Sequence, residues 1–243
     1  MRDRLILLPG WGLGISALEP LAAALRGLDE HLRVEIEPLP VLESVLLQDW
    51  LDELDSNLPD NVWLGGWSLG GMLASELAAR RGERCCGLVT LASNPSFVSR
   101  DDWPTAMPSA TFDAFITGFA EAPNSTFKRF CLLCSQGAVD PRPMAQLLLG
   151  GAPRAQPSTL LAGLELLGNM DVRPALQAFN GPQLHLFAGT DGLVPAETAN
   201  ALLTLLPDVE VGLIEQACHA FLLEAPHELA AAIQAFLHEL GDD

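Results

Sequence analysis

The 243-residue chain is predicted to be an α/β protein with a mostly parallel sheet of about six strands and helices on both faces. Short apolar runs end at glycine or proline, which is typical of strands buried on both faces. Stretches with a helical spacing of apolar residues separate these runs, and such alternation gives parallel strands joined by right-handed crossovers. Hydrophobic residues make up 49% of the chain, enough for one large core.

Each element follows from a local pattern. The first strand is the continuous apolar run 5–8, which Pro9 and Gly10 end. The other predicted strands are 34–36, 61–65, 87–91, 184–187 and 209–214. The predicted helices are 16–25 with Ser16 as N-cap, 42–58, 69–81, and 226–240.

One long stretch interrupts the alternation. Residues 94–170 contain helical segments separated by prolines and no convincing strand. We therefore expect a core formed by 1–93 and 171–243, and a helical cap (lid) formed by 94–170 and inserted after the fourth strand. Such an insertion would lie above the carboxyl ends of the strands, where open α/β sheets bind ligands.

Charge and hydropathy exclude some classes of function. The chain has 13 basic and 31 acidic residues, and its formal net charge is −18. This balance argues against general binding to nucleic acids or anionic membranes. The apolar run near the N-terminus is too short for a signal peptide, and no run reaches the roughly 18 residues of a membrane helix. We expect a soluble, cytoplasmic protein with no nucleic-acid and no membrane partner.

The five cysteines are odd in number and lack the spacing of a disulfide framework, which indicates reduced thiols. Cys131 and Cys134 form a C-x-x-C pair, which indicates a zinc or redox site only when further ligands accompany it. No second ligand pair is present, so we expect both side chains on a packed helix face. The sequence indicates no metal and no organic cofactor.

A candidate nucleophile lies between the third predicted strand and the next helix. Residues 66–70 form a G-x-S-x-G motif, whose weight comes from this strand-to-helix context. The tight turn exposes the Ser68 hydroxyl above the sheet, and small neighbours are needed because other backbone comes close. The helix N-terminus behind Ser68 favours negative charge there. A glycine-rich turn with an incidental serine is the alternative.

A serine nucleophile needs a base to remove its proton. Of the five histidines, only His219 lies in a short loop after the last strand, whereas His185 falls inside a strand and is expected to pack there. The orienting acid should lie between serine and histidine in the chain. Asp191, in the loop after the fifth strand, meets this condition, and Asp171 is its rival. Ordinary loop and turn residues are the alternatives.

The tetrahedral intermediate of acyl transfer needs two N–H donors. The backbone of Leu69, just after the nucleophile, is one candidate, and Trp11 in the loop after the first strand is the other. The indoles of Trp11 and Trp67 either wall the site or pack in the core. In the first case, an apolar acyl chain would run along Trp67, Phe130 and Leu133.

Four segments resemble those of one family, the pimeloyl-[acyl-carrier-protein] methyl ester esterases of biotin synthesis, which have the α/β-hydrolase fold. They are 8–13, 63–71, 99–104 and 191–195. The similarity covers nearly the whole chain. The nucleophile motif is common to all α/β hydrolases, whereas the flanking tryptophans and the Arg-Asp-Asp-Trp-Pro stretch are more specific. Arg100 in that stretch is expected to pair with the neighbouring Asp101 and Asp102.

The resemblance implies a serine carboxylesterase that removes the methyl group from a pimeloyl ester on an acyl-carrier protein. It assigns Ser68, Asp191 and His219 as the catalytic triad. It also implies substrate contacts at Trp11, Ser68, Leu69, His219, Phe130, Cys131, Leu132, Leu133 and Cys134.

Basic residues of the expected cap are candidates for contact with the carrier protein. By the resemblance, Arg129 and Arg142 match arginines with that role. Between residues 122 and 164, four basic residues accompany one acidic residue, a net charge of +3 against −18 for the whole chain. A basic cap suits an acidic carrier, and ordinary solvated surface is the alternative. The candidate contacts are Lys128, Arg129, Arg142 and Arg154.

Other functions remain open because a fold does not determine a substrate. A general carboxylesterase for small, short-acyl esters would have the same triad, and carbon–carbon bond hydrolases share it. A non-catalytic receptor on this fold would not need it. Dehalogenases and epoxide hydrolases of this fold place an aspartate at the nucleophile position, so Ser68 counts against them.

Overall fold

The computed structural model describes residues 4–239, which form one six-stranded sheet in the order β2-β1-β3-β4-β5-β6. Every neighbouring pair of strands is parallel. The predicted fold class is confirmed, and all six predicted strands are present with ends that differ by no more than two residues. The strands are β1 (Arg4–Leu8), β2 (Arg33–Ile36), β3 (Val62–Trp67), β4 (Cys85–Leu91), β5 (Gln183–Ala188) and β6 (Glu210–Ile214).

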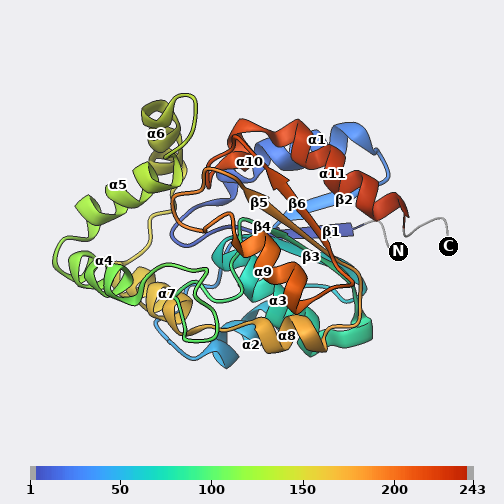
Figure 1. Ribbon diagram of the computed structural model, residues 1–243, viewed down its shortest axis with the longest axis horizontal. Helices are drawn as coiled ribbons and strands as arrows, with labels where there is room; N and C mark the ends of the chain where they lie inside the picture. Colours follow the sequence, from blue (N-terminus) through green and yellow to red (C-terminus); the bar gives the residue numbers. More distant parts are fainter. Residues whose placement is uncertain (1–3, 240–243) are drawn as a thin grey trace.

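Helices cover both faces of this sheet (Figure 1). β3 and β5 are buried along their whole length, so β3 is continuously apolar, whereas β5 also carries the buried polar residues Gln183 and His185. One face carries α1 (Glu19–Leu28) and α11 (Pro226–Glu239), which pack against each other. The other face carries α2 (Leu47–Asn57), α3 (Leu69–Arg81), α8 (Arg173–Ala178) and α9 (Thr198–Leu205). Position 240 of the predicted last helix lies outside the described residues. Within the described chain, no helix has the length and apolar character needed to cross a membrane.

The first predicted helix begins later than its pattern indicates. Ile15–Ala17 form a short 3₁₀ turn, and α1 starts at Glu19. Pro20 suits the first turn of α1, because the N–H groups of that turn have no acceptor within the helix and proline lacks an N–H. Ser16 is not the N-cap of α1, since its hydroxyl donates to the Gly151 carbonyl at 3.2 Å.

The second predicted helix also begins later, at Leu47 rather than at residue 42. Ser44 is responsible, because its hydroxyl bonds the Asp49 carboxylate and accepts the Leu46 N–H at 3.2 Å. The Ser44 carbonyl accepts the Trp50 indole N–H at 2.8 Å. These local bonds compete with helical hydrogen bonding and hold the preceding chain extended.

The helices that follow β4 stand to one side of the sheet (Figure 1). α4 packs against α5 and α7, and α5 packs against α6. The next helix, α8, packs against α3, so the chain has returned to the layer of helices that covers the sheet before β5 begins. We propose that 94–170 form a cap on a core made of the remaining residues. The cap helices are α4 (Ser109–Glu121), α5 (Pro123–Cys134), α6 (Pro141–Gly151) and α7 (Pro157–Asn169).

His185 lies inside β5 and is buried, as the sequence predicts. Its Nδ1 is 2.7 Å from Thr90 Oγ1, and its Nε2 is 3.3 Å from Gln183 Oε1. A neutral ring fits both neighbours, because Nε2–H donates to the amide oxygen while Nδ1 accepts from the hydroxyl. Burial lowers the pKa of His185 from 6.5 to about 3.

Replacing His185 by glutamine (His185→Gln) should make the protein less sensitive to acid. The unfolded chain binds the His185 proton near pH 6.5, whereas the folded protein binds it only near a pH of about 3. A lowered folded pKa gives stability that is complete above pH 6.5 and is lost as the pH falls toward about 3. In that window the wild-type free energy of unfolding should fall faster than the variant's, by up to about 1.4 kcal/mol per pH unit. Urea unfolding of both proteins measures this, and parallel pH profiles would contradict it.

Candidate active site

Ser68 occupies a strained turn between the end of β3 and the start of α3. Its φ is 55° and its ψ is −119°, a conformation that costs a non-glycine residue about 1–3 kcal/mol. The Ser68 N–H donates to the Leu91 carbonyl at 2.9 Å. Its carbonyl accepts the Gly71 N–H at 3.0 Å and the Ser93 hydroxyl at 2.9 Å. These bonds to β4, to the loop after it and to the first turn of α3 hold the strained backbone in place.

Two glycines of the motif are required by close backbone contacts. A Cβ on Gly66 would lie 2.3 Å from the carbonyl carbon of Gly70. A Cβ on Gly70 would lie 2.3 Å from the Leu8 oxygen and 2.5 Å from the Pro9 oxygen. The turn that carries Ser68 is therefore pressed against the end of β1 and the loop that follows it.

His219 and Asp191 meet at the carboxyl ends of β6 and β5. His219 Nδ1 is 2.7 Å from Asp191 Oδ2, and the two side chains are 0% and 1% exposed. The carboxylate can only accept at Nδ1, so the neutral ring carries its proton on Nδ1 and a free lone pair on Nε2. Nε2 is buried and has no hydrogen-bond partner among the described residues. A general base needs such a lone pair, and among the described residues no hydrogen bond joins it to the Ser68 hydroxyl.

The two loops that carry this pair are tied to each other. The Asp191 Oδ1 accepts the N–H groups of Leu193 at 2.7 Å and Val194 at 2.9 Å. Thr190 donates from both its N–H and its hydroxyl to the Ala217 carbonyl, at 2.9 and 2.8 Å. These bonds fix the carboxylate and set the loop of Asp191 against the loop of His219.

Trp67 joins the histidine loop to the Ser68 turn. Its indole N–H donates to the His219 carbonyl at 3.0 Å, and the two rings lie 5.5 Å apart. Its side chain is fully buried and lines neither of the two cavities described below. Of the two interpretations left open by the sequence, the structure places this indole in the core, next to His219.

Asp171, the rival acid, lies elsewhere. Its carboxylate accepts two hydrogen bonds from the Arg173 guanidinium, at 2.8 and 2.6 Å, and is 3.6 Å from Arg100. The expected pairing of Arg100 with Asp101 and Asp102 is therefore wrong among the described residues, where the ion pair of Arg100 is with Asp171. Only the folded chain brings residues 100 and 171 together.

The two candidate oxyanion donors lie on adjacent backbone segments. Leu69 is the first residue of α3, a position whose N–H has no acceptor within the helix. Trp11 lies in a turn closed by the Leu13 N–H on the Gly10 carbonyl at 3.1 Å. A Cβ on Gly10 would lie 3.5 Å from the Ser68 Cβ, so this turn borders Ser68.

The Trp11 side chain connects the core to the cap. Its indole N–H donates to the Leu160 carbonyl of α7 at 2.7 Å. Four phenylalanine rings of α4 and α5 surround it with centroids 5.0–5.9 Å away, mostly edge-on: Phe115, Phe119, Phe127 and Phe130. Aromatic edge contacts and a buried hydrogen bond make this residue a fixed wall.

Trp11 lines two cavities. The first has a volume of about 260 Å³ and is almost entirely apolar. Among the described residues that line this cavity, Arg129 is the one with a charged side chain. Leu193, which follows Asp191 in the same loop, also lines the cavity. The second has a volume of about 360 Å³ and is bordered by Leu69 and Arg154.

The predicted substrate contacts on helix α5 face a cavity, the solvent or the protein interior. Phe130 and Leu133 line the first cavity, whereas Leu132 is 47% exposed. Cys131 and Cys134 are buried on a packed helix face, as predicted. Burial raises the pKa of the Cys131 thiol to about 12 and that of the Cys134 thiol well above its ordinary value. Among the described residues, no group of three or more histidine, cysteine or acidic side chains is placed to hold a metal ion.

The predicted carrier contacts are exposed on the cap helices and their loops. Lys128 and Arg129 lie on α5, Arg142 on α6, and Arg154 between α6 and α7. None of them forms an ion pair with a described residue. By contrast, seven arginines pair with carboxylates: Arg4, Arg26, Arg80, Arg81, Arg84, Arg100 and Arg173.

Several residues of the first cavity are missing from the sequence-based interpretation. They come from the loop after β4 and from α4 and α7, and include Phe97, Met107, Phe112, Phe115, Leu164 and Leu167. A signal was present, because six of the ten phenylalanines fall between residues 97 and 130. Such clustering predicts an aromatic wall, although it does not say which side chains face the cavity.

These features define an α/β hydrolase: a parallel sheet, a strained serine turn after β3, and a histidine–aspartate pair after β6 and β5. The sequence model of the Alpha/beta hydrolase family matches residues 5–232. Pimeloyl-[acyl-carrier protein] methyl ester esterase from Aromatoleum aromaticum is 34% identical over 249 residues, which are 96% of this chain and 97% of that protein. The esterase of the same name from Serratia marcescens is 30% identical, covering 96% and 93%. This chain belongs to the pimeloyl-[acyl-carrier protein] methyl ester esterase family within the α/β hydrolases.

Other similar proteins differ in length or share the fold alone. The biotin biosynthesis bifunctional protein BioHC of Cellvibrio japonicus is 36% identical over 99% of this chain, which spans only 48% of that protein. Bromoperoxidase from Bacillus anthracis superimposes with a TM-score of 0.84 at 20% identity, covering 98% of this chain and 92% of that one. The esterase EaEST of Exiguobacterium antarcticum gives 0.83 at 18% identity, covering 97% and 92%.

Replacing Gly70 by alanine should destabilise the protein strongly. The new methyl group would overlap the Leu8 and Pro9 carbonyl oxygens, and backbone atoms cannot rotate away as a side chain can. We expect a loss of about 3 kcal/mol of unfolding free energy. Gly27→Ala is the matched control, because no atom lies within 4 Å of its Cβ on α1 and alanine favours a helix by about 0.5–1 kcal/mol. Chemical unfolding of both variants measures this, and equal effects would contradict the close contact at Gly70.

Proposed function

We propose that this protein is a serine carboxylesterase that hydrolyses the methyl ester of a pimeloyl group carried on an acyl-carrier protein. The observation that carries the proposal is the buried His219 ring, whose Nδ1 is bonded to Asp191, whose Nε2 is unpartnered among the described residues, and whose carbonyl is bonded by Trp67, the residue before Ser68. The names of the similar proteins supply the substrate. A cytoplasmic location is proposed from the odd number of cysteines without a disulfide framework.

The first half of the reaction forms an acyl-enzyme. Ser68 Oγ attacks the ester carbonyl while His219 Nε2 takes its proton. Asp191 accepts the Nδ1–H and stabilises the imidazolium that results. The N–H groups of Leu69 and Trp11 bind the oxyanion of the tetrahedral intermediate. The carbon–oxygen bond to the alcohol then breaks, and the imidazolium protonates the methanol that leaves.

The second half restores the enzyme. Water attacks the acyl-serine carbonyl while His219 Nε2 removes a proton from it. The same two N–H donors bind the second oxyanion. Collapse of this intermediate returns the proton to Ser68 and releases the free carboxylic acid. No metal ion or organic cofactor takes part in either half.

The first cavity suits the acyl chain. Its lining is apolar, and Trp11, Phe130 and Leu133 give the extended surface that a chain of methylene groups needs. Arg129 in the same lining is a polar group suited to the far end of the chain, where the carrier is attached. The fully buried Trp67 is left out of this substrate path and acts by holding the His219 carbonyl.

The unpaired cations of the cap support docking of an acidic carrier. Lys128, Arg129, Arg142 and Arg154 are exposed and have no carboxylate partner among the described residues. The rest of the surface is acidic and repels such a carrier. Complementary charge of this kind raises the rate of encounter and orients the partner.

Replacing Ser68 by alanine should abolish ester hydrolysis and leave the fold intact. A loss of about 10⁶-fold in kcat is expected, because the nucleophile and its base act as one unit. Ser75→Ala is the matched control, since that hydroxyl lies on the same helix and, among the described residues, bonds the Gly71 carbonyl alone, at 2.8 Å. A fluorophosphonate should label the wild type and the control but not the Ser68 variant. Near-wild-type turnover of methyl esters by Ser68→Ala would end the proposal.

The double variant Lys128→Ala/Arg142→Ala should weaken use of the carrier-bound ester alone. We expect KM for pimeloyl-carrier methyl ester to rise about tenfold, with a reduced dependence on salt. The rate on free dimethyl pimelate should not change. Arg33→Ala is the control, because Arg33 is an exposed cation on β2 that also lacks an ion pair among the described residues. Equal wild-type rates on the free and carrier-bound esters would instead indicate a general carboxylesterase.

A further inference from the structure

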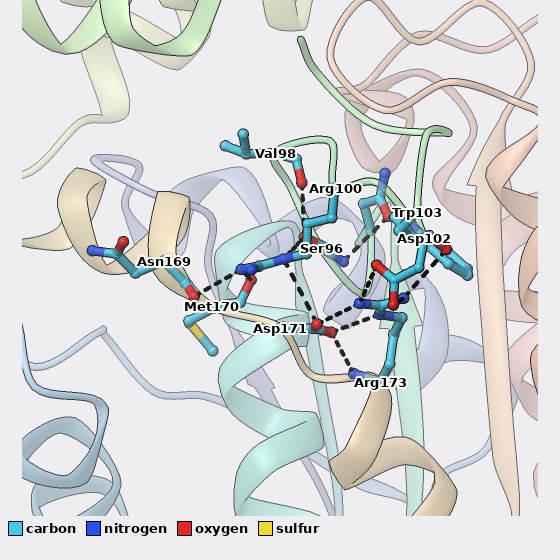
Figure 2. Close-up of polar contacts among 10 residues, drawn as sticks. Ser96, Val98, Arg100, Asp102, Trp103, Asn169, Met170, Asp171 and Arg173 are labelled. Atoms are coloured by element: carbon cyan, nitrogen blue, oxygen red, sulfur yellow. Dashed lines mark hydrogen bonds and ion pairs between the residues drawn. The ribbon is translucent and has the colours of Figure 1, made fainter. Parts of the chain in front are cut away.

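The chain leaves the sheet after β4 and returns to it before α8 through two segments that lie side by side (Figure 2). We call residues 94–107 and 169–173 the neck. The Val172 N–H donates to the Pro95 carbonyl at 2.8 Å, which joins the two segments through backbone. Among the described residues, the other hydrogen bonds and ion pairs between the two segments involve Arg100 or Arg173.

Arg100, on the outgoing segment, binds the end of α7. Its Nη2 donates to the Asn169 carbonyl at 3.0 Å and to the Met170 carbonyl at 3.4 Å. Its Nε donates to Ser96 Oγ at 2.9 Å and lies 3.6 Å from Asp171 Oδ2 (Figure 2). Arg100 thus satisfies the last carbonyl groups of a cap helix from the opposite side of the neck.

Arg173, on the returning segment, binds in the reverse direction. It makes a two-pronged contact with Asp171, at 2.8 and 2.6 Å, and reaches Asp102 with Nη2 at 3.1 Å (Figure 2). Its guanidinium also lies 5.5 Å from the ring centre of Trp103. The Trp103 indole N–H donates to Asn94 Oδ1 at 2.8 Å. The network therefore runs without a break across both segments.

The network is half-buried and charged. The Arg173 and Asp171 side chains are 14% and 24% exposed, so solvent screens their attraction less than that of a surface pair. Hydrogen bonding from Arg173 lowers the pKa of the Asp171 carboxyl. Glu76 of α3 faces the same group, and burial together with Asp171 raises its pKa.

Both segments of the neck lead directly into walls of the first cavity. Phe97 and Met107 line that cavity from the outgoing segment and are joined by the Met107 N–H on the Phe97 carbonyl at 3.0 Å. Leu164 and Leu167 line it from α7, which ends at Asn169. Arg100 bridges these two walls, since it binds the carbonyl of Asn169 from a position three residues after Phe97.

We propose that Arg100, Asp171 and Arg173 are positioning residues that fix the separation of these two cavity walls and so select the acyl-chain length. The inference rests on the proposed esterase function. The three residues touch no reacting atom and act through Phe97, Met107, Leu164 and Leu167. An apolar cavity discriminates chain length through methylene contacts, which depend on how closely its walls approach.

The test compares p-nitrophenyl acetate with p-nitrophenyl heptanoate. Asp171→Asn keeps the side-chain size but removes the charge that both arginines share. We expect kcat/KM for the heptanoate to fall about tenfold, mainly through KM, with the acetate nearly unchanged. Arg100→Lys keeps the positive charge but has fewer donors for its acceptors, so it should give a smaller shift of the same ratio. Asp60→Asn is the control, because it breaks the exposed Arg84–Asp60 pair of 2.7 Å on the core.

Binding without turnover separates this inference from the function on which it rests. Tryptophan fluorescence would follow heptanamide and acetamide binding to the wild type, Asp171→Asn and Arg100→Lys. Weaker binding of heptanamide alone in the variants supports the inference even if no ester is hydrolysed. An unchanged heptanamide-to-acetamide ratio in both variants, or an equal loss for both ligands, would overturn it. Absence of ester hydrolysis by the wild type would overturn the proposed function alone.

Discussion

The buried carboxylate of Asp191 is the constraint on which the site depends. At 1% exposure, both of its oxygens need partners, because an unpaired buried charge costs far more than a typical hydrogen bond returns. The N–H groups of Leu193 and Val194 satisfy one oxygen, and His219 satisfies the other. The loops after β5 and β6 can supply these partners together only because the two strands are neighbours in the sheet. Trp67 extends the chain of contacts from His219 to the Ser68 turn.

Local sequence predicts most of the fold and part of the candidate site. The strands β1, β3 and β4 are mostly apolar runs, so they are visible in the sequence without knowledge of their neighbours. The turn at Ser68 is equally local, because the glycines that its contacts require lie within the same motif. The start of α2 was missed because Ser44 offers the backbone competing hydrogen bonds that no periodicity reveals. The residues that decide the Ser68 turn and the start of α2 therefore lie within a few positions of each feature.

Tertiary packing decides what the sequence left open. Helix α5 presents Phe130 and Leu133 to a cavity and Cys131 and Cys134 to the interior, while Leu132 faces outward. The helical period gives these faces, but which face meets the cavity depends on α4, α7 and the sheet. The pairing in the neck is another example. A carboxylate next in sequence is not the partner of Arg100, because the returning segment offers both a carboxylate and unsatisfied helix carbonyls.

One backbone bond of the cap bears on how the site reaches its working shape. The Ala220 N–H, next to His219, donates to the Cys134 carbonyl at the end of α5 at 3.0 Å. Cys218 on the same loop touches Met144 of α6, with 3.6 Å between the sulfurs. The loop of His219 is thus held against the end of α5 and against α6 in the folded chain. Binding of a ligand therefore does not have to order that corner, which lowers the conformational-entropy cost of association.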